Sequence, residues 1–548
     1  MPTSSSNPSE PMGQFDRLVN WLSTSEKYLF WLQWPFALAA VVYFVFIAIA
    51  ETGPICRYGH DVFSFLDGGW RIYNGQMPYR DFNLPLGPLE YLIMAGGMLL
   101  TKGSTQGIAI GNAAFGIIVA VWGWLLARRR MPVIPALLVT AWLILTATSP
   151  TPLGHATPDF PSCAMLYNRH AYALLGLVLV ECACAGERSR FWGGFSSGVA
   201  LALMALLKLN FFGIAGLFLL ASVAANRDTM PRFKGCLAGI ASVAVAITIY
   251  LRLAILTFFS DIWLAVEARR SRLQLLGTIH GLVGRAETLI LVLMTVAAVL
   301  LIAPGRLRQR RAITTFLLGG IVIASTPLFL KTDSGETHCQ LATLWATILV
   351  GALATAFRES KEKVAVSAVM ALCLVAIFAQ FFLDARSVQT LVRFNDPIVK
   401  AEGFSFAHPA MERVKFYDIK ADRMGYQFDN GHFQVDQVND GLTLLEKFSA
   451  QDESVFTLGY NNPFTYILQR KPALGGSVWL QIGDNFPANH YISGDRLFGD
   501  ARLVMVANYP SDLQESNAAL AEAYRPYLLQ HFAFVASSQW WSLYRRTT

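Results

Sequence analysis

Long, uninterrupted runs of apolar residues restrict this sequence to the few folds that are stable in a lipid bilayer. Examples are the stretches 28–50, 235–259, 288–303 and 364–383. A helix of roughly 20 apolar residues crosses a hydrocarbon core of about 30 Å, and these runs approach or exceed that length. In lipid only helices and closed barrels satisfy every backbone hydrogen bond, and the runs lack the alternation typical of strands. The sequence therefore predicts a polytopic α-helical membrane protein.

The charged residues support the same class and orient the protein. Of 548 residues, 15% are charged, against roughly 25% in a typical soluble protein. The net charge of +7 comes from basic clusters between apolar runs: Arg128–Arg130, Arg188 with Arg190, Arg227 to Lys234, Arg306 to Arg311, and Arg358 to Lys363. The positive-inside rule places such clusters in the cytoplasm, so they face membrane lipids and give no reason to expect a nucleic-acid partner.

This orientation fixes the outer loops and the number of crossings. The loops 51–86, 149–169, 259–286 and 331–338 then lie outside, as does everything after Leu383. Counting the apolar runs predicts about eleven spans, and at most about thirteen. Two apolar stretches, 88–101 and 106–127, lie where only one crossing fits. The first is short and contains Gly96–Gly97, so we expect a re-entrant or interfacial helix there.

Three regions follow from these patterns. Residues 1–27 form a polar cytoplasmic tail without the features of a cleaved signal peptide, and 28–383 form the transmembrane module. Residues 384–548 are polar and rich in turn formers, which indicates a soluble extracytoplasmic α/β domain. Its expected elements are a buried strand at 455–460, helices at 463–469 and 513–530, and strands at 532–537 and 541–545.

The first outer loop, 51–86, is dense in Asp, Arg, Tyr and Gly. We expect an amphipathic surface helix over 61–74, which Gly75 ends, and a turn that begins at Pro78. Asp61 stands at the start of this helix. It could simply cap the helix or complement its dipole, or it could carry chemistry at the membrane surface.

This loop resembles the first external loop of the GT-C superfamily of membrane glycosyltransferases. These enzymes use polyprenyl-phosphate sugars, and they include the protein O-mannosyltransferases and the lipid A aminoarabinose transferases. The shared pattern is an Asp that opens a surface helix, a Gly fourteen residues later, a Pro-Tyr pair and a Pro-rich approach to the next helix. Here these are Asp61, Gly75, Pro78–Tyr79 and Leu84–Pro88. Shorter similarities occur around Lys208-Leu209-Asn210, in 455–472 and in the closing stretch 541–546.

The resemblance implies a function and a set of roles. It implies an inverting transfer in which Asp61 is the base that takes the proton of the acceptor. Tyr79 is a candidate for substrate binding, and Asp81 could position the acceptor or cap the turn. Asp67 is expected to be structural. Many relatives carry paired acids at the loop start, whereas Val62 follows Asp61 here. The metal requirement therefore stays open, and a divalent cation such as Mg²⁺ or Mn²⁺ remains an option.

A leaving lipid phosphate needs cations, and charges in or beside apolar spans are costly enough to suggest function. The candidates are Arg169, Lys208, Arg252, Arg269, Arg270, Arg272 and His338. Each could instead snorkel to lipid headgroups, and His338 could be an interfacial histidine whose hydrogen bonds are made within the protein.

The leading hypothesis is therefore an enzyme of the inner (plasma) membrane. It would move a sugar from a polyprenyl-phosphate donor to a glycan, lipid or protein acceptor at the outer face. The alternative is a transporter or flippase of lipid-linked saccharides, which would use the same cations along a translocation path. Transporters tend to place polar groups at mid-bilayer depth, whereas here the charges stand mostly near outer helix ends.

Overall fold

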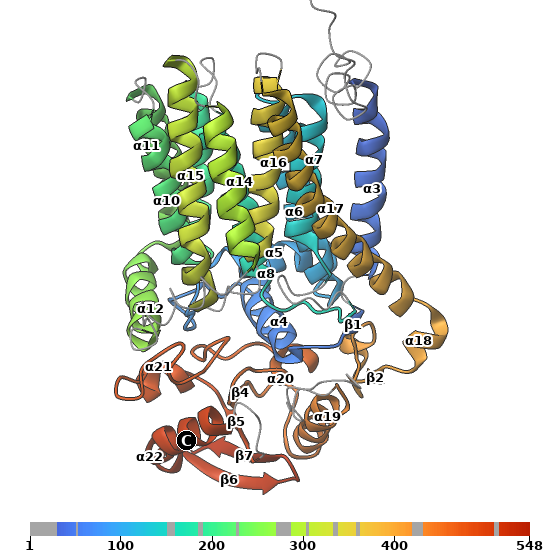
Figure 1. Cartoon of the computed structure of the whole chain (residues 1–548). Coiled ribbons are helices and arrows are strands. Elements are labelled where there is room, and N and C mark those ends of the chain that lie inside the picture. Colours follow the sequence, from blue (N-terminus) through green and yellow to red (C-terminus); the bar gives the residue numbers. More distant parts are fainter. Residues whose placement is uncertain are drawn as a thin grey trace, which may run out of the picture.

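The computed structural model describes residues 30–50, 53–150, 159–184, 190–225, 230–269, 286–302, 306–331, 338–357, 362–418, 431–508 and 514–547. Figure 1 shows a layer of long, roughly aligned helices and, at one end of it, a smaller C-terminal domain that contains the strands. This arrangement confirms the prediction of a polytopic helical protein with a C-terminal α/β domain.

The helical layer follows the apolar runs. Its helices are α3 (Gln33–Ala50), α5 (Leu89–Leu100), α6 (Gln106–Arg128), α7 (Val133–Thr148), α8 (Leu166–Ala183), α9 (Arg190–Ala205), α10 (Leu209–Ala225), α11 (Met230–Leu251), α14 (Ala286–Ile302), α15 (Arg306–Lys331), α16 (His338–Phe357) and α17 (Lys363–Phe394). Within the described ranges, four stretches are long and apolar enough to cross a membrane: Phe30–Ala50, Gln106–Arg128, Met230–Leu251 and Lys363–Phe394. Large apolar side chains such as Ile118, Val245 and Phe378 are exposed on the outer faces of the layer. Lipid is the solvent that such faces require, so the chain is an integral membrane protein.

The short helix α5 does not cross the layer. Its start lies at the outer end of the layer, because the backbone N–H of Leu89 donates to the carbonyl of Leu206 at the end of α9, at 2.9 Å, and His170 near the start of α8 bridges Glu90 and Asn112 at 2.8 and 2.9 Å. Its far end also reaches the outer surface, where Tyr466 of the C-terminal domain donates a hydrogen bond to the carbonyl of Gly103 at 3.0 Å. Helix α6 therefore makes the crossing, and a re-entrant or interfacial placement of α5 in the membrane stays a prediction.

The basic clusters meet at the opposite end of the layer. Arg130, which follows α6, and Arg232, in the first turn of α11, both form ion pairs with buried Glu181 near the end of α8. Arg232 also donates to the hydroxyl of Ser222 at 2.9 Å. Two clusters that the sequence assigns to one face of the membrane therefore converge on one carboxylate, away from the C-terminal domain.

Two helices lie between the layer and the C-terminal domain: α4 (Gly59–Tyr73), from the first outer loop, and α12 (Ala254–Arg269) (Figure 1). The apolar run 235–259 is not a single span. Helix α11 ends at Leu251, and Arg252 turns the chain with a left-handed backbone (φ 52°) before α12 begins. Arg252 thus stands in a turn at the outer end of α11 and not within a helix.

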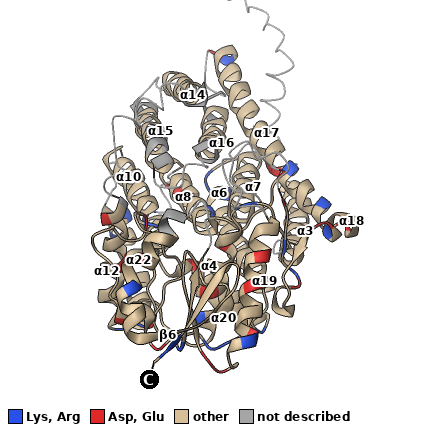
Figure 2. Cartoon of the chain, turned by 90° about the horizontal axis from the view of Figure 1, so that it is seen from below, with Lys and Arg blue, Asp and Glu red and all other residues tan. Residues whose placement is uncertain are grey.

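The C-terminal domain is built on a four-stranded sheet with the order β4-β5-β7-β6. The strands are β4 (Val455–Leu458), β5 (Leu503–Ala507), β6 (Phe532–Ser537) and β7 (Trp541–Arg546), with helices α18 (Pro397–Ala401), α19 (Gly431–Phe448), α20 (Phe464–Ile467), α21 (Gly494–Phe498) and α22 (Gln514–His531). Strands β4 and β5 are parallel, and the other two pairings are antiparallel. The five predicted elements are present, whereas α19 and β5 were not predicted. Figure 2 shows charged residues gathered on this domain and sparse along the helical layer.

A second, small sheet joins the first outer loop to the C-terminal domain. Strand β1 (Pro54–Ile55) pairs in parallel with β3 (Lys415–Phe416), and β2 (Phe404–Ser405) pairs antiparallel on the other side of β3. The segment before α4 is thus part of a sheet whose other strands lie about 350 residues later in the chain. Helix α17 continues past residue 383 to Phe394 and leads directly into this region.

Candidate active site

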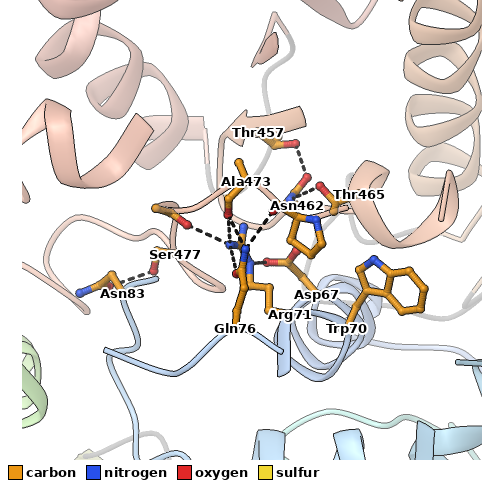
Figure 3. Close-up of polar contacts among 12 residues, drawn as sticks. Asp67, Trp70, Arg71, Gln76, Asn83, Thr457, Asn462, Thr465, Ala473 and Ser477 are labelled. Atoms are coloured by element: carbon orange, nitrogen blue, oxygen red, sulfur yellow. Dashed lines mark hydrogen bonds and ion pairs between the residues drawn. The ribbon is translucent and has the colours of Figure 1, made fainter. Parts of the chain in front are cut away.

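Helix α4 is fixed to the C-terminal domain by a fully buried ion pair. Arg71 donates to the Asp67 carboxylate at 2.9 Å across one helical turn, and both side chains are 0% exposed. The guanidinium also donates to the carbonyls of Ala473 and Gly475, each at 2.9 Å (Figure 3). Asn462 donates to the second Asp67 oxygen at 3.2 Å. Burial raises the pKa of the Asp67 carboxyl, an effect that Arg71 and Asn462 oppose.

Neighbouring side chains extend this contact along the whole loop. The Trp70 indole donates to the carbonyl of Arg470 at 2.8 Å, and the Gln76 amide donates to the carbonyls of Pro472 and Ala473. Ser477 donates to the Asn83 side chain at 3.0 Å. The C-terminal domain therefore holds α4 as a rigid element, and Asp67 serves this contact.

Asp61 stands in the first turn of α4 and does not cap its own helix. The cap position is Tyr58, which has a left-handed backbone and no side-chain cap hydrogen bond. One carboxylate oxygen of Asp61 instead accepts a hydrogen bond from the backbone N–H of Met165 at 3.0 Å, and His60 lies 3.5 Å from the other. Met165 caps α8, so the Asp61 carboxylate lies at the point where the first turns of α4 and α8 meet.

The C-terminal domain forms one wall beside this carboxylate. The Tyr460 ring packs edge-on against the His60 ring, with 4.8 Å between the centroids. The side chain of Asn461 donates to the carbonyl of His60 at 2.6 Å. The Asp61 side chain keeps 15% of its surface exposed, whereas Asp67 keeps none. Asp61 is thus an accessible carboxylate at the junction of helical layer and domain.

Arg169 lies in the first turn of α8 but points into the protein. It is buried and donates to the carbonyls of Ser149, Ser162 and Ala164. These bonds hold the segment that carries the αL cap residue Met165. The structure therefore gives Arg169 a supporting role toward Asp61 through Met165, and no direct opening to a ligand is seen.

Lys208 is a second cation near the start of α8. It stands in the turn between α9 and α10. Its ammonium donates to the Asn168 side chain at 3.3 Å and lies 5.4 Å from the ring centroid of Tyr167. Asn168 and Met165 belong to the same first turn of α8, so Asp61 and Lys208 contact adjacent parts of one helix start.

Tyr79 and Asp81 shape the turn that follows α4. The Tyr79 hydroxyl donates to the carbonyl of Leu86 at 2.6 Å, and its ring is buried against Phe258 of α12. Asp81 accepts from the backbone N–H of Met77 and from Arg80. Burial opposes ionisation of Asp81, but the hydrogen bonds from Arg80 and Met77 outweigh it and hold the carboxyl pKa below its usual value. Both residues brace the loop.

The remaining predicted cations either show no contact with the start of α8 or lie outside the described residues. Arg252 is exposed in the turn between α11 and α12. Arg270 and Arg272 lie outside the described residues, as do the side chains of Arg269 and His338. The contacts thus bring Asp61, Arg169 and Lys208 together at the start of α8, and they place Tyr79 and Asp81 at the other end of the loop.

Several residues at this point were not predicted from the sequence. Met165 contributes only its backbone N–H, and no pattern of side chains in the sequence marks a backbone donor. Asn168 directly precedes Arg169, and its polar neighbours were the available signal. His60, Tyr460 and Asn461 come together from parts of the chain about 400 residues apart. In the described part of the chain, no group of three or more His, Cys, Asp or Glu residues is placed to hold a metal ion.

No protein-family profile and no curated protein matches the sequence. Among solved structures, the chain matches ArnT from Cupriavidus metallidurans bound to undecaprenyl phosphate, with 10% identity and a TM-score of 0.37, over 95% of this chain and 98% of that one. The apo state of the same ArnT matches with 10% identity and a TM-score of 0.38, over 94% and 98%. ArnT is a lipid A aminoarabinose transferase, the group that the first outer loop resembles.

Proposed function

We propose that this protein is a GT-C-type glycosyltransferase that moves a sugar from a polyprenyl-phosphate carrier to an acceptor at the outer face of the membrane. The observation that carries the proposal is the placement of Asp61. Its carboxylate is accessible, is held by the Met165 N–H, and lies where the helical layer meets the C-terminal domain. A lipid-borne donor must reach the site from the membrane, and a polar acceptor must reach it from the water. This junction serves both.

Asp61 acts as the general base. An inverting transfer needs a carboxylate within hydrogen-bond reach of the acceptor hydroxyl, which loses its proton as the new glycosidic bond forms. The Met165 N–H occupies one carboxylate oxygen and so orients the group. The pinned helix α4 behind it keeps this geometry fixed, as a positioned catalytic group requires.

Lys208 stabilises the leaving lipid phosphate. Its ammonium is held beside the first turn of α8 by Asn168 and by the face of Tyr167. A cation at the membrane boundary offsets the charge that develops on the phosphate as the sugar departs. In this proposal Arg169 is a positioning residue, because it holds the segment before α8 and does not reach the site itself.

Replacing Asp61 by Asn tests the base directly. The amide oxygen still accepts a hydrogen bond from Met165, so folding should persist while the proton acceptor is lost. We expect turnover of a polyprenyl-phosphate sugar by the purified protein to fall roughly 10²–10⁴-fold, with donor binding retained. Asp61→Glu is the matched variant, because it keeps a carboxylate and should retain part of the activity. A stable Asp61→Asn protein with full turnover would remove the enzyme hypothesis.

The same pair of variants separates the enzyme from a transporter of lipid-linked saccharides. A flippase that uses Asp61 only for structure would move a labelled lipid-linked sugar across the membrane of proteoliposomes equally well as Asp61→Asn and as Asp61→Glu. For Lys208, replacement by Met should weaken donor binding about tenfold or more, the usual effect of losing a charge-assisted contact to phosphate. Lys208→Arg keeps the charge and is the control. Equal donor affinity in both Lys208 variants would contradict a phosphate contact.

A further inference from the structure

An apolar groove of about 810 Å³ runs along the outside of the helical layer between α3 and α6, and Leu137, Thr140 and Ile144 of α7 complete its lining. Its lining includes Ala37 and Ala40 of α3 and Ala113 and Ala114 of α6. Small side chains at these positions leave the space between the two helices open. The groove follows α6 from Ile110 to Arg128.

One end of the groove is cationic. Arg128, in the last turn of α6, lines the groove together with Gln33. Its guanidinium lies 5.5 Å from the ring centroid of Phe30 and 6.0 Å from that of Trp124, so aromatic faces hold it at the groove mouth. Among the described residues that line the groove none is acidic. The groove thus combines an apolar channel with a single positive end, which fits an anionic headgroup on a long apolar chain.

The dimensions of the groove select among possible occupants. From Ile110 to Arg128 helix α6 rises about 27 Å, nearly the whole hydrocarbon core of about 30 Å. The acyl chain of a phospholipid ends near the midplane, about 15 Å from its headgroup, so it would fill only half of this length. One chain longer than a leaflet matches best.

We infer that the groove binds a polyprenyl phosphate, with its phosphate on Arg128 and its isoprenoid chain between α3 and α6. Arg128 belongs to a basic cluster at the end of the layer opposite the C-terminal domain. The groove therefore takes this lipid with its phosphate at the face opposite the proposed catalytic site. The choice of a polyprenyl phosphate rests in part on the proposed function, which releases this compound.

A photoreactive undecaprenyl phosphate, incubated with the purified full-length protein and mapped by mass spectrometry, tests the inference. We expect cross-links on peptides of α3 and α6, separate from any at the start of α8. Arg128→Gln should reduce them about tenfold, because the phosphate loses its charged partner. Arg129→Gln is the matched control, since Arg129 is exposed at the same helix end but does not line the groove.

A second pair of variants tests the channel itself. Ala114→Trp fills the groove from an exposed position and should abolish the α3 and α6 cross-links. Ile118→Trp places the same bulk one turn away, outside the lining, and should leave them unchanged. Unchanged cross-links in both Arg128→Gln and Ala114→Trp would overturn the inference. The inference would also be overturned if phosphatidylglycerol competed with undecaprenyl phosphate equally well for the groove, or if a small membrane protein occupied the groove.

The experiment also separates this inference from the proposed function. Asp61→Asn should leave the α3 and α6 cross-links intact, whatever its effect on turnover. Cross-links in the groove of a protein that transfers no sugar would leave the inference standing and reject the enzyme. Turnover that depends on Asp61, without cross-links in the groove, would support the enzyme and reject the groove as a lipid site.

Discussion

The buried pair of Arg71 and Asp67 provides a quantitative test of how the first outer loop is held. The Arg71 guanidinium is wholly buried and donates to Asp67, Gln76, and the carbonyls of Ala473 and Gly475. Arg71→Met keeps most of the apolar stem and removes the charge. It leaves the Asp67 carboxylate buried with only the Asn462 amide as its remaining polar contact in this network.

The expected cost follows from this geometry. Removing one partner of a buried ion pair destabilises a protein by about 3–5 kcal/mol, because the other charge is left in a low-dielectric site. The penalty should appear as undocking of α4 from the C-terminal domain. Because each 1.4 kcal/mol is tenfold, local opening should become roughly 10² to 4 × 10³-fold more frequent. Hydrogen exchange of the backbone amides of Asn83 and Gly475 reports it, since they donate across this contact to the carbonyls of Gly476 and Asp81.

Two further variants make the reasoning refutable. Arg80→Met breaks the pair with Asp81 in the same loop, but the Arg80 side chain is 52% exposed, so the loss should stay below about 1 kcal/mol. The double variant Asp67→Leu with Arg71→Met removes both charges and should be more stable than Arg71→Met alone. If Arg71→Met exchanges no faster than Arg80→Met, or if the double variant is no better than the single one, burial does not set the strength of this contact.

Three other predictions concern packing, acid stability and orientation. Gly97→Ala should disrupt the α5–α6 hairpin and lower the yield of folded protein, because a Cβ there would lie 1.9 Å from the carbonyl oxygen of Gly107. Gly96→Ala is the control, since its Cβ would meet nothing within 4 Å, and it should be neutral or stabilise the fold by up to about 1 kcal/mol. The Asp81 pKa is lowered in the folded protein, so ionised Asp81 stabilises the fold above the unfolded pKa of about 3.9, and this contribution is lost as the pH falls through the lower folded pKa. In Asp81→Asn the free energy of unfolding should therefore fall less steeply on acidification, which unfolding curves recorded at a series of pH values measure. A reporter that is active only outside the cytoplasm should be active when fused after Thr548, and a silent reporter there would reverse the orientation.

The sequence alone determined the membrane class, the position of most elements and the importance of the first outer loop. Apolar runs and basic clusters suffice for this, because lipid requires apolar surfaces and internally satisfied backbone wherever the chain crosses it. Parity predicted that α5 does not cross the membrane, and local patterning predicted the closing strands of the C-terminal domain. Turn formers likewise predicted the end of α4 at Gly75, which has a positive φ of 84°.

Only the tertiary structure decided which of the candidate residues meet. It separated Asp61 from Asp67, two carboxylates six residues apart on one helix, because the C-terminal domain buries one and leaves the other accessible. It turned Arg169 inward and placed Lys208 beside Asn168. Contacts between segments about 400 residues apart leave no local trace in the sequence, since each side chain fits its own helix or turn equally well without its partner.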